Sequence, residues 1–437
     1  MTPPASRPWA SRRARRLGVV ALLTCAAACA PPGKGREEVR FWALGREGEV
    51  VQQLLPEFER RNPGVHVTVQ QIPWTAAHEK LLTAYVGDAT PDLAQIGNTW
   101  VPELEALKAL QDLSPLIARS PVVRPDSYFA GVWDTGVIDG KTWGVPWYVD
   151  TRVLFYRKDI LARAGVTEVP RTWAAWIEAM KRVKSSVGPD RFAILLPTDE
   201  WAQPVILAMQ AGSTLLRDGG RFGAFRAPEF RHALELYISL FRDRLAPALG
   251  MNQVANVYQQ FAEGYFAMYI TGPWNLGEFR RRLPPNLQDV WATAPLPAER
   301  AGDWPGVSLA GGSSLVVFGA SKHQDAAWKL IEFLSEPSQQ GAFYALTGDL
   351  PAVRAAWNGP ALAADPLVRA FFTQLEHTRP VPKIPEWEQI AWRTAEVAEQ
   401  ALRGRISVDE AAVTLDHEVD RMLDKRRYLL DRKRTSP

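Results

Sequence analysis

An aspartate and an arginine stand inside an otherwise apolar run of the chain. Residues 144–159 read Gly-Val-Pro-Trp-Tyr-Val-Asp-Thr-Arg-Val-Leu-Phe-Tyr-Arg-Lys-Asp, which places Asp150 and Arg152 near the middle. A strand this apolar is expected in a sheet covered on both faces, where an ionised pair is costly unless it is partnered or lines a cleft. The run therefore predicts that something polar approaches this strand. Asp150 could also serve only as the partner of Arg152.

Other polar groups stand where strands are expected to end. Asn98 and Thr99 follow an apolar strand, and α/β sheets present ligand groups at the carboxyl ends of their strands. The alternative for Asn98 is a simple helix cap. Glu47 stands at a strand-to-helix junction, where it could contact a ligand or only favour the helix dipole. Gly311-Gly312-Ser313 would let backbone approach a ligand closely, or would mark a hinge.

Tryptophans are a third group of candidate binding residues, after the charged pair and the polar residues at strand ends. Of the 17 tryptophans, 16 lie beyond residue 28. A sugar ring has a face of C–H groups and a rim of hydroxyls, so flat aromatic faces combined with carboxylate, amide and guanidinium groups suit it. Trp274 follows Gly272-Pro273 on a predicted turn, and Trp387 follows Ile384-Pro385-Glu386. The remaining cleft candidates are Trp42, Trp74, Trp100 and Trp201.

The sequence lacks the residue patterns of most enzyme classes and cofactor sites. The six histidines show no metal-ligand spacing, and no G-x-S-x-G or G-x-G-x-x-G motif is present. We therefore expect no catalytic residue, no metal and no cofactor. Carboxylate neighbours such as Asp199-Glu200 could in principle serve glycoside hydrolysis, so a secreted glycosidase stays open as a minor alternative.

The N-terminus predicts export. Five arginines precede a short apolar stretch, Leu17 to Ala28, which is too short to span a bilayer. We expect residues 1–28 to be a cleaved signal peptide, by either the general or the twin-arginine route. Ala26-Ala27-Ala28-Cys29 is similar to a lipobox, which predicts lipidation of Cys29 and a periplasmic or cell-surface protein anchored to a membrane. Residues 29–38 have the composition of a tether.

Charge and cysteine content change once residues 1–28 are set aside. Five of the 51 basic residues and none of the 48 acidic ones lie there, so the remaining chain has a net charge of about −2. It has no sustained basic stripe with interleaved aromatics, which argues against nucleic-acid binding. The two cysteines are Cys25 and Cys29, so the body has no disulfide available and must be stabilised by packing.

Strand-like and helical patterns alternate along the chain, which predicts an α/β architecture. Residues 39–43 and 65–71 are expected strands, and 47–61 an amphipathic helix. Residues 137–143 are an expected hairpin, with Asp139-Gly140 at its turn. Thr172 is the expected N-cap of a helix over 172–184. Further helices are expected at 326–334 and 391–402.

The 144–159 strand and seven further short segments resemble the carbohydrate-binding members of the extracellular solute-binding proteins of ABC importers, a class that includes maltose- and trehalose-binding proteins. In chain order, the seven are Phe41-Trp42, Leu55-Pro56-Glu57-Phe58, Asn62-Pro63-Gly64-Val65, residues 91–100, Thr271-Gly272-Pro273-Trp274, Gly311-Gly312-Ser313-Ser314, and Leu350-Pro351-Ala352-Val353-Arg354. Each motif is weak alone, but their shared order is specific, and the resemblance covers nearly the whole chain beyond residue 28.

The resemblance implies a type II periplasmic-binding-protein fold with two discontinuous lobes. The N-terminal lobe would comprise 39–149 and 311–355, and the C-terminal lobe 153–305 and 365–425. Hinge strands would lie at 150–152 and 306–310, with a basic tail at 426–437. The two lobes would close on a ligand and then dock on permease subunits, with the chain a monomer.

The resemblance also implies roles for particular residues. Trp274 would stack on sugar, and Asp150 would bind sugar hydroxyls. Arg354 would contact the ligand or close a salt bridge between lobes. The full predicted ligand set is Trp42, Glu47, Trp74, Asn98, Thr99, Trp100, Asp150, Arg152, Trp201, Trp274, Gly312, Ser313, Arg354 and Trp387. A di- or oligosaccharide is the expected ligand. The alternative is a non-carbohydrate solute or a chemoreceptor-linked sensor.

Overall fold

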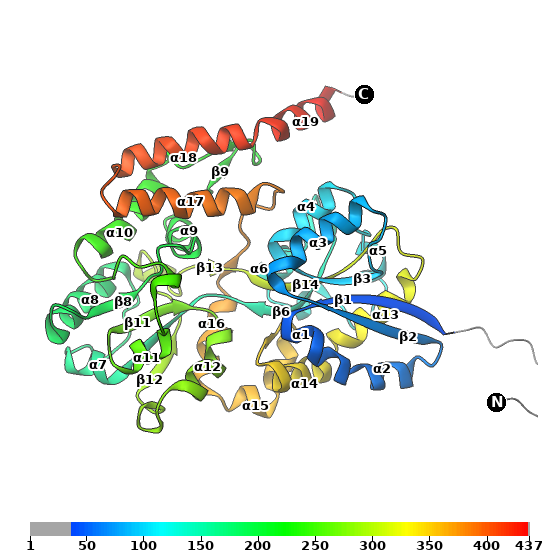
Figure 1. Ribbon diagram of the computed structural model, residues 1–437, viewed down its shortest axis with the longest axis horizontal. Helices are drawn as coiled ribbons and strands as arrows, with labels where there is room; N and C mark the ends of the chain where they lie inside the picture. The colour runs from blue at the N-terminus through cyan, green and yellow to red at the C-terminus, as the bar shows by residue number, and fades with distance from the viewer. Residues whose placement is uncertain (1–35, 436–437) are drawn as a thin grey trace, which may run out of the picture. The chain divides into compact units, whose positions relative to one another are not determined.

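Two larger β-sheets organise residues 36–435, the part of the chain that the computed structural model describes (Figure 1). The first sheet has six strands in the order β15-β6-β14-β3-β1-β2. The strands span β1 Glu37–Leu44, β2 Val65–Ile72, β3 Leu93–Gly97, β6 Val145–Asp150, β14 Gly311–Val317 and β15 Leu350–Pro351. From Glu37 onward the chain groups into one compact unit.

The first sheet contains both parallel and antiparallel strand pairs. Strand β1 pairs in parallel with both β2 and β3. Its carboxyl-terminal half is buried on both faces, as parallel strands usually are. Strand β14 returns from much later in the sequence and lies antiparallel between β3 and β6. A strand from residue 311 onward therefore occupies the middle of a sheet that begins at residue 37.

The second sheet has four strands in the order β12-β7-β11-β8. They span β7 Val153–Arg157, β8 Phe192–Leu195, β11 Phe266–Thr271 and β12 Trp291–Ala294. Strand β7 begins three residues after β6 ends, so the chain passes directly from one sheet to the other through Thr151 and Arg152. The register pairs Val153 with Thr271, which sets the start of β7 beside the end of β11.

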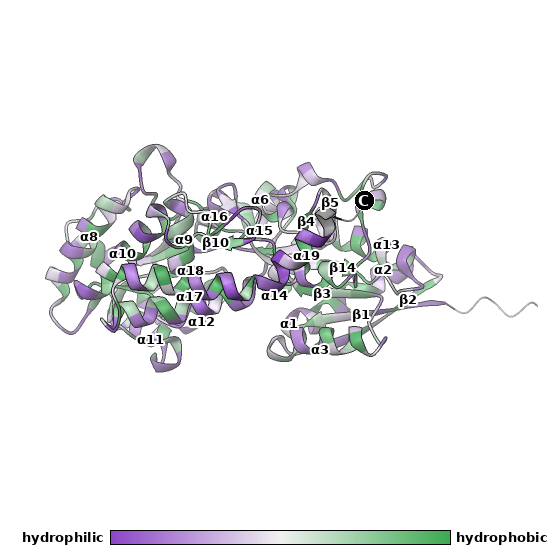
Figure 2. Cartoon of the chain, turned by 90° about the horizontal axis from the view of Figure 1, so that it is seen from above, coloured by the Kyte–Doolittle hydropathy of each residue, from purple (hydrophilic) through white to green (hydrophobic). Residues whose placement is uncertain are grey.

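Helices cover both sheets. Those grouped with the first sheet are α1 Gly45–Val50, α2 Leu55–Arg61, α3 Trp74–Val86, α4 Val101–Ala106, α5 Ser114–Ile117, α6 Ala130–Asp134, α13 Gln324–Ser335, α14 Pro337–Thr347 and α15 Pro360–Ala363. Those grouped with the second are α7 Lys158–Arg163, α8 Trp173–Val187, α9 Ala202–Gln210, α10 Pro228–Arg242, α11 Val257–Ala262, α12 Trp274–Arg282, α16 Pro366–Leu375, α17 Trp387–Leu402, α18 Val408–Met422 and α19 Asp424–Thr435. Figure 2 shows α10 and α17 banded in both colours, as expected for helices with one buried face.

Three short two-stranded sheets complete the described part. They pair β4 Val137–Ile138 with β5 Lys141–Thr142, β9 Leu216–Arg217 with β10 Phe222–Gly223, and β13 Ser308–Leu309 with β16 Thr378–Arg379. After β16, residues 380–386 lead to α17. Along this linker Lys383 Nζ donates to Asp134 Oδ1 at 2.7 Å and to the Val137 carbonyl oxygen at 2.7 Å. Lys383 thereby fixes the linker to α6 and β4.

Several local expectations are confirmed. Asp139 and Gly140 have positive φ at the tip of the β4–β5 hairpin. The Thr172 side chain accepts from the Ala175 backbone N–H as the N-cap of α8.

The helix expected over 47–61 is instead split into α1 and α2 by a 3₁₀ turn, with Pro56 in the first turn of α2. The segment expected to be a basic tail is helical as α19, and Arg426 donates to the Gly220 carbonyl oxygen.

Candidate functional site

A cavity of about 140 Å³ lies where the chain passes between the two sheets. Several chain segments meet there: the end of β3, the β6–β7 passage, the start of α9, the residues from β13 into β14, and the 380–386 linker. The lining residues are Gly97, Asn98, Thr99, Asp150, Arg152, Trp201, Leu309, Ala310, Gly311, Gly312 and Val381. Six of the predicted ligand residues are therefore brought together: Asn98, Thr99, Asp150, Arg152, Trp201 and Gly312.

Asn98 presents an unsatisfied donor at this cavity. Its side chain is only 4% exposed, and its Oδ1 accepts a 2.8 Å hydrogen bond from Ser314 Oγ. No acceptor within residues 36–435 meets its Nδ2. Buried amide groups are normally paired, because leaving one unpaired costs free energy. The unpaired Nδ2–H of this cavity-lining residue is thus a candidate donor for a ligand oxygen.

Glycine is required on the β14 side of the cavity. A Cβ on Gly312 would stand 2.3 Å from the Tyr148 carbonyl oxygen, and Gly312 has a φ of +118°. A Cβ on Gly311 would stand 2.3 Å from Asp150 Oδ1. These glycines let β14 and β6 run close together, and the Asp150 carboxylate lies in the space that a side chain would otherwise fill.

Asp150, Arg152 and Trp274 form a chain of contacts across the passage between sheets. Arg152 Nη1 donates to Asp150 Oδ1 at 3.0 Å. The Arg152 guanidinium carbon lies 4.5 Å from the centre of the Trp274 ring, a cation–π arrangement. Trp274 begins α12 and is 48% exposed, which is unusual for a large aromatic residue. The Arg152 Nε has no acceptor among residues 36–435.

A cluster of carboxylates lies close to the cavity at the edge of the first sheet. The Tyr148 hydroxyl donates to Glu47 Oε1 at 2.9 Å. Burial, reinforced by the Glu47 carboxylate, raises the pKa of Tyr148 and keeps the hydroxyl protonated. Burial, together with the charges of Glu47 and Asp150, also raises the pKa of Asp349 to about 7. Asp349 was not predicted from the sequence.

The other predicted aromatic residues support the surroundings of the cavity. Trp201, at the start of α9, meets Trp387 edge-on with ring centres 5.8 Å apart. Trp74 and Trp100 also meet edge-on at 5.8 Å. Trp74 packs against Gly45, where a Cβ would stand 2.7 Å from its Cδ1. These contacts place Trp74 and Trp100 beside Glu47 and Gly97, next to the cavity but not in its wall.

Four expected ligand residues lie elsewhere. Trp387 is 1% exposed and packs in the core under the second sheet, so it offers no face to a ligand. Trp42 is buried in the core between β1 and α3, with Lys80 Nζ 4.9 Å from its ring centre. Ser313 is buried and donates to the Ile96 carbonyl oxygen. Arg354 pairs with Glu376, Nη1 to Oε2 at 2.8 Å, and lies over Phe129, away from the cavity lining.

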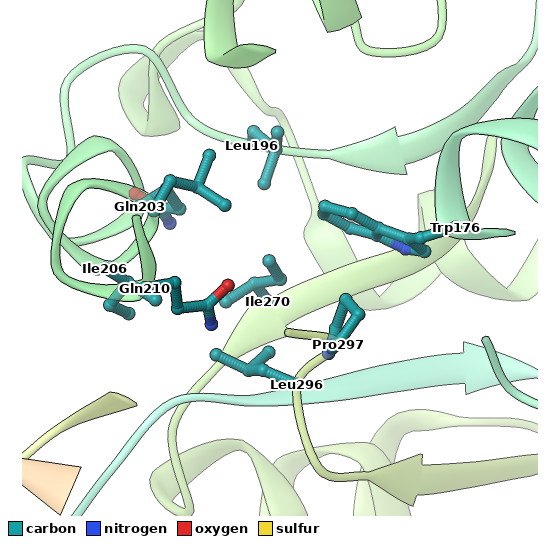
Figure 3. A pocket seen from close by; sticks show the side chains of 9 residues that line it. Trp176, Leu196, Gln203, Ile206, Gln210, Ile270, Leu296 and Pro297 are labelled. Carbon is teal, nitrogen blue, oxygen red and sulfur yellow. The ribbon is translucent and has the colours of Figure 1, made fainter. Parts of the chain in front are cut away.

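Other hollows in the described chain have a different character. The cavity of Figure 3 lies between the second sheet and its helices, with Trp176 of α8, Ile206 of α9 and Ile270 of β11 in its wall. Its volume is about 10 Å³, enough for one water at most, and its lining is almost wholly apolar. A groove of about 520 Å³ lies along the 380–386 linker, beside the β4–β5 hairpin and Arg426. The groove contains none of the predicted ligand residues.

Residues 36–435 contain neither a metal-binding cluster nor a membrane-spanning helix. No group of three or more histidine, cysteine, aspartate or glutamate side chains there could hold a metal ion. None of the helices in that range is long and apolar enough to cross a bilayer. Cys29 and the expected signal peptide lie outside the described residues.

A family match covers most of the chain, and all of the cavity lining except Val381 falls within it. Residues 42–341 match the model of the bacterial extracellular solute-binding proteins. The chain belongs to this family. Members bind a solute and do not convert it, which agrees with the expectation that the chain is not an enzyme.

Solved and curated relatives agree with this assignment. The solved sugar-binding protein MalE of Xanthomonas citri is 49% identical, covering 90% of this chain and 99% of that one with a TM-score of 0.88. This match confirms the periplasmic-binding-protein fold. The diacetylchitobiose-binding protein DasA of Streptomyces coelicolor is 27% identical over 86% of this chain and 89% of its own length. A galactooligosaccharide-binding protein of Bacillus subtilis is 26% identical over 89% of this chain and 92% of its own length.

Sequence reasoning missed part of the cavity wall. Leu309 and Ala310 were predicted only as part of a hinge strand and Val381 belongs to no motif, and the folded chain brings all three to Asn98. Val381 stands between Pro380 and Pro382, which signals an extended linker but not its destination. Asp349 stands directly before the Leu-Pro-Ala-Val-Arg motif, so its position was the only available signal.

Proposed function

We propose that this protein captures a sugar, a di- or oligosaccharide, and delivers it to the permease of an ABC importer. The observation that carries the proposal is the composition of the 140 Å³ cavity and its rim. The buried Asn98 Nδ2–H, the Asp150 carboxylate and the half-exposed Trp274 ring provide a donor, an acceptor and an apolar face. These are the groups that hydroxyls and C–H faces of a sugar require.

The wider ligand is expected to extend beyond the cavity. The 140 Å³ space is small beside the 300–1,000 Å³ typical of whole ligand pockets. It suits one sugar ring beside Trp201, with further rings outside it toward Trp274. For some two dozen heavy atoms at about −0.3 to −0.4 kcal/mol each, the affinity would be roughly micromolar.

In this proposal, the permease recognises the closed arrangement of the two lobes. The lobes would be built on the two sheets, with 39–149 and 311–355 on one side and 153–305 and 365–425 on the other. A ligand that contacts both Asn98 and Trp274 would stabilise a closed arrangement selectively. Export by the signal peptide 1–28 and lipidation at Cys29 would hold the protein at a membrane outside the cytoplasm, near its permease.

A thermal-shift screen tests the function. The purified protein would be heated with mono-, di- and oligosaccharides, and with polyols, amino acids and short peptides as controls. A ligand at about 100 times its dissociation constant adds roughly 2.7 kcal/mol to the free energy of unfolding and raises the melting temperature. We expect a shift with one class of glycan. A shift with an amino acid or peptide alone would overturn the sugar assignment and retain the solute-binding one.

A further inference from the structure

Arg152 is held in place more firmly than direct ligand binding alone would require. It stands on the two-residue passage between β6 and β7, and Ser308 holds its backbone from both sides. Ser308 Oγ accepts from the Arg152 N–H at 3.2 Å and donates to the Arg152 carbonyl oxygen at 2.9 Å. The side chain is 16% exposed. Backbone and side chain are therefore both fixed at the point where the chain leaves one sheet for the other.

The partner of this fixed guanidinium is the ring of Trp274. The two residues are brought together by one register, because Val153 pairs with Thr271 three residues before Trp274. The six-membered part of the ring lies against Gly272, where a Cβ would stand 1.9 Å from Cζ3. Arg152 lies over the ring, 4.5 Å from its centre. Nearly half of Trp274 nevertheless remains exposed, so part of the indole is still open.

We propose that Arg152 is a positioning residue for Trp274: held by Asp150 and Ser308, its guanidinium backs one face of the indole and so orients the other face toward the ligand. The proposal rests on the proposed function in assuming that Trp274 stacks on a sugar. It differs from the expectation that Arg152 binds the ligand directly. A planar guanidinium suits this task, because it stacks on an aromatic face while its edge donates to a carboxylate.

The arrangement also links specificity to the passage between sheets. Asp150 ends a strand of the first sheet, whereas Trp274 follows a strand of the second. Arg152 contacts both, so a rotation about Thr151 would change the support of the indole. Trp274 would then be oriented best in one relative arrangement of the two sheets.

A double-mutant cycle tests the proposal against direct contact. Arg152→Met keeps an apolar stem but removes the guanidinium, and we expect it to weaken glycan binding about 3- to 10-fold. In a Trp274→Ala background the same change should have no further effect, because the ring that it positions is gone. If the two losses multiply instead, Arg152 contacts the ligand directly and the proposal is wrong. Arg152→Lys keeps the charge but removes the planar guanidinium group, so it should behave like Arg152→Met.

A matched control exists in the chain. Arg171 lies over Trp304 with the same 4.5 Å separation and lines none of the cavities described above. Arg171→Met removes an equivalent cation–π pair and should leave the affinity unchanged. If it weakens binding as much as Arg152→Met does, the effect is a general loss of structure and not the positioning of Trp274.

A spectroscopic readout keeps this test separate from the identity of the ligand. Near-ultraviolet circular dichroism and acrylamide quenching report the surroundings of tryptophan without any ligand. Arg152→Met should alter both in the native protein but not when Trp274 is already alanine. No change in the native background would overturn the positioning role. Failure of every glycan to bind, with this spectral change present, would overturn the proposed function and leave Arg152 as the support of Trp274.

Discussion

Ser314 Oγ donates a 2.8 Å hydrogen bond to Asn98 Oδ1, although the two residues are 216 positions apart in the sequence. The bond fixes the amide so that its nitrogen, and not its oxygen, is left without a partner among residues 36–435. Asn98, directly after β3, therefore keeps an unpaired donor, and Asp150 lines the same cavity with a carboxylate acceptor.

Replacing the Asn98 donor should weaken binding. Asn98→Asp keeps the acceptor for Ser314 but puts an oxygen where the unpaired N–H stands, and we expect at least a tenfold loss of affinity by calorimetry. Gln340→Glu is the matched control, because Gln340 is a buried amide whose nitrogen donates to the Trp147 carbonyl oxygen and whose oxygen accepts from Ala352. It should lower the melting temperature without changing the affinity. Equal affinities for Asn98→Asp and the native protein would remove Asn98 from the site.

Trp274 should matter far more than another tryptophan of similar exposure. Trp274→Ala removes the exposed stacking face and should weaken glycan binding at least tenfold, with little change in the melting temperature. Trp392→Ala is the comparison, because Trp392 is 53% exposed and lines none of the cavities described. If both variants bind as the native protein does, the ligand does not stack on Trp274.

Asp349 should make stability depend on pH near neutrality. Its pKa is raised to about 7, so between about pH 4 and pH 7 the folded protein holds a proton that the unfolded chain has released. This contribution to the free energy of unfolding therefore falls as the pH rises through that window. Asp349→Asn removes it, so the advantage of the variant over the native protein should grow by about 2–3 kcal/mol between pH 5 and pH 8.

Urea unfolding at a series of pH values measures this difference. Asp126→Asn serves as the control, because Arg124 lowers the pKa of the exposed Asp126 and its contribution is complete above about pH 5. The control should show no slope between pH 5 and pH 8. A flat difference for Asp349→Asn over the same range would mean that Asp349 ionises normally in the folded protein.

Gly312 should tolerate no side chain. Gly312→Ala forces a Cβ to within 2.3 Å of the Tyr148 carbonyl oxygen at a φ of +118°, and we expect a loss of at least about 2 kcal/mol of stability. Gly165 also has a positive φ, +72°, but has open space around its missing Cβ. Gly165→Ala should cost only about 1 kcal/mol. Similar melting temperatures for the two variants would contradict the close approach of β14 and β6.

The sequence predicted features that depend on local pattern. The Thr172 cap and the Asp139-Gly140 turn are set by residues within a few positions, and both are present. The α/β class follows from alternating strand and helix patterns in the same way. The grouping of Asn98, Asp150 and Gly312 rested on family resemblance, since nothing in the spacing of these residues shows that their strands are neighbours.

Long-range packing explains where the site predictions differ from the structure. The β14–β6 pairing shifts register between Ser313 and Ser314. Ser313 was expected to contact the ligand, but its hydroxyl donates to the Ile96 carbonyl oxygen, and Ser314 bonds to Asn98. Trp387 was expected to contact the ligand, but it is the first residue of α17 and is buried beside Trp201. Neighbouring residues alone reveal neither a β-bulge nor how deeply the first residue of a helix is buried.

The central position of β14 has a consequence for how the chain folds. Strands β3 and β6 cannot be joined in the first sheet until residues 311–317 are available, so the sheet that starts at Glu37 is completed only after most of the chain has been made. Contacts between such distant residues carry a large loop-closure entropy, and folding that depends on them is slow. The second sheet, whose four strands lie between residues 153 and 294, has no such dependence. During synthesis it can therefore form first, and the first sheet then closes around a late strand.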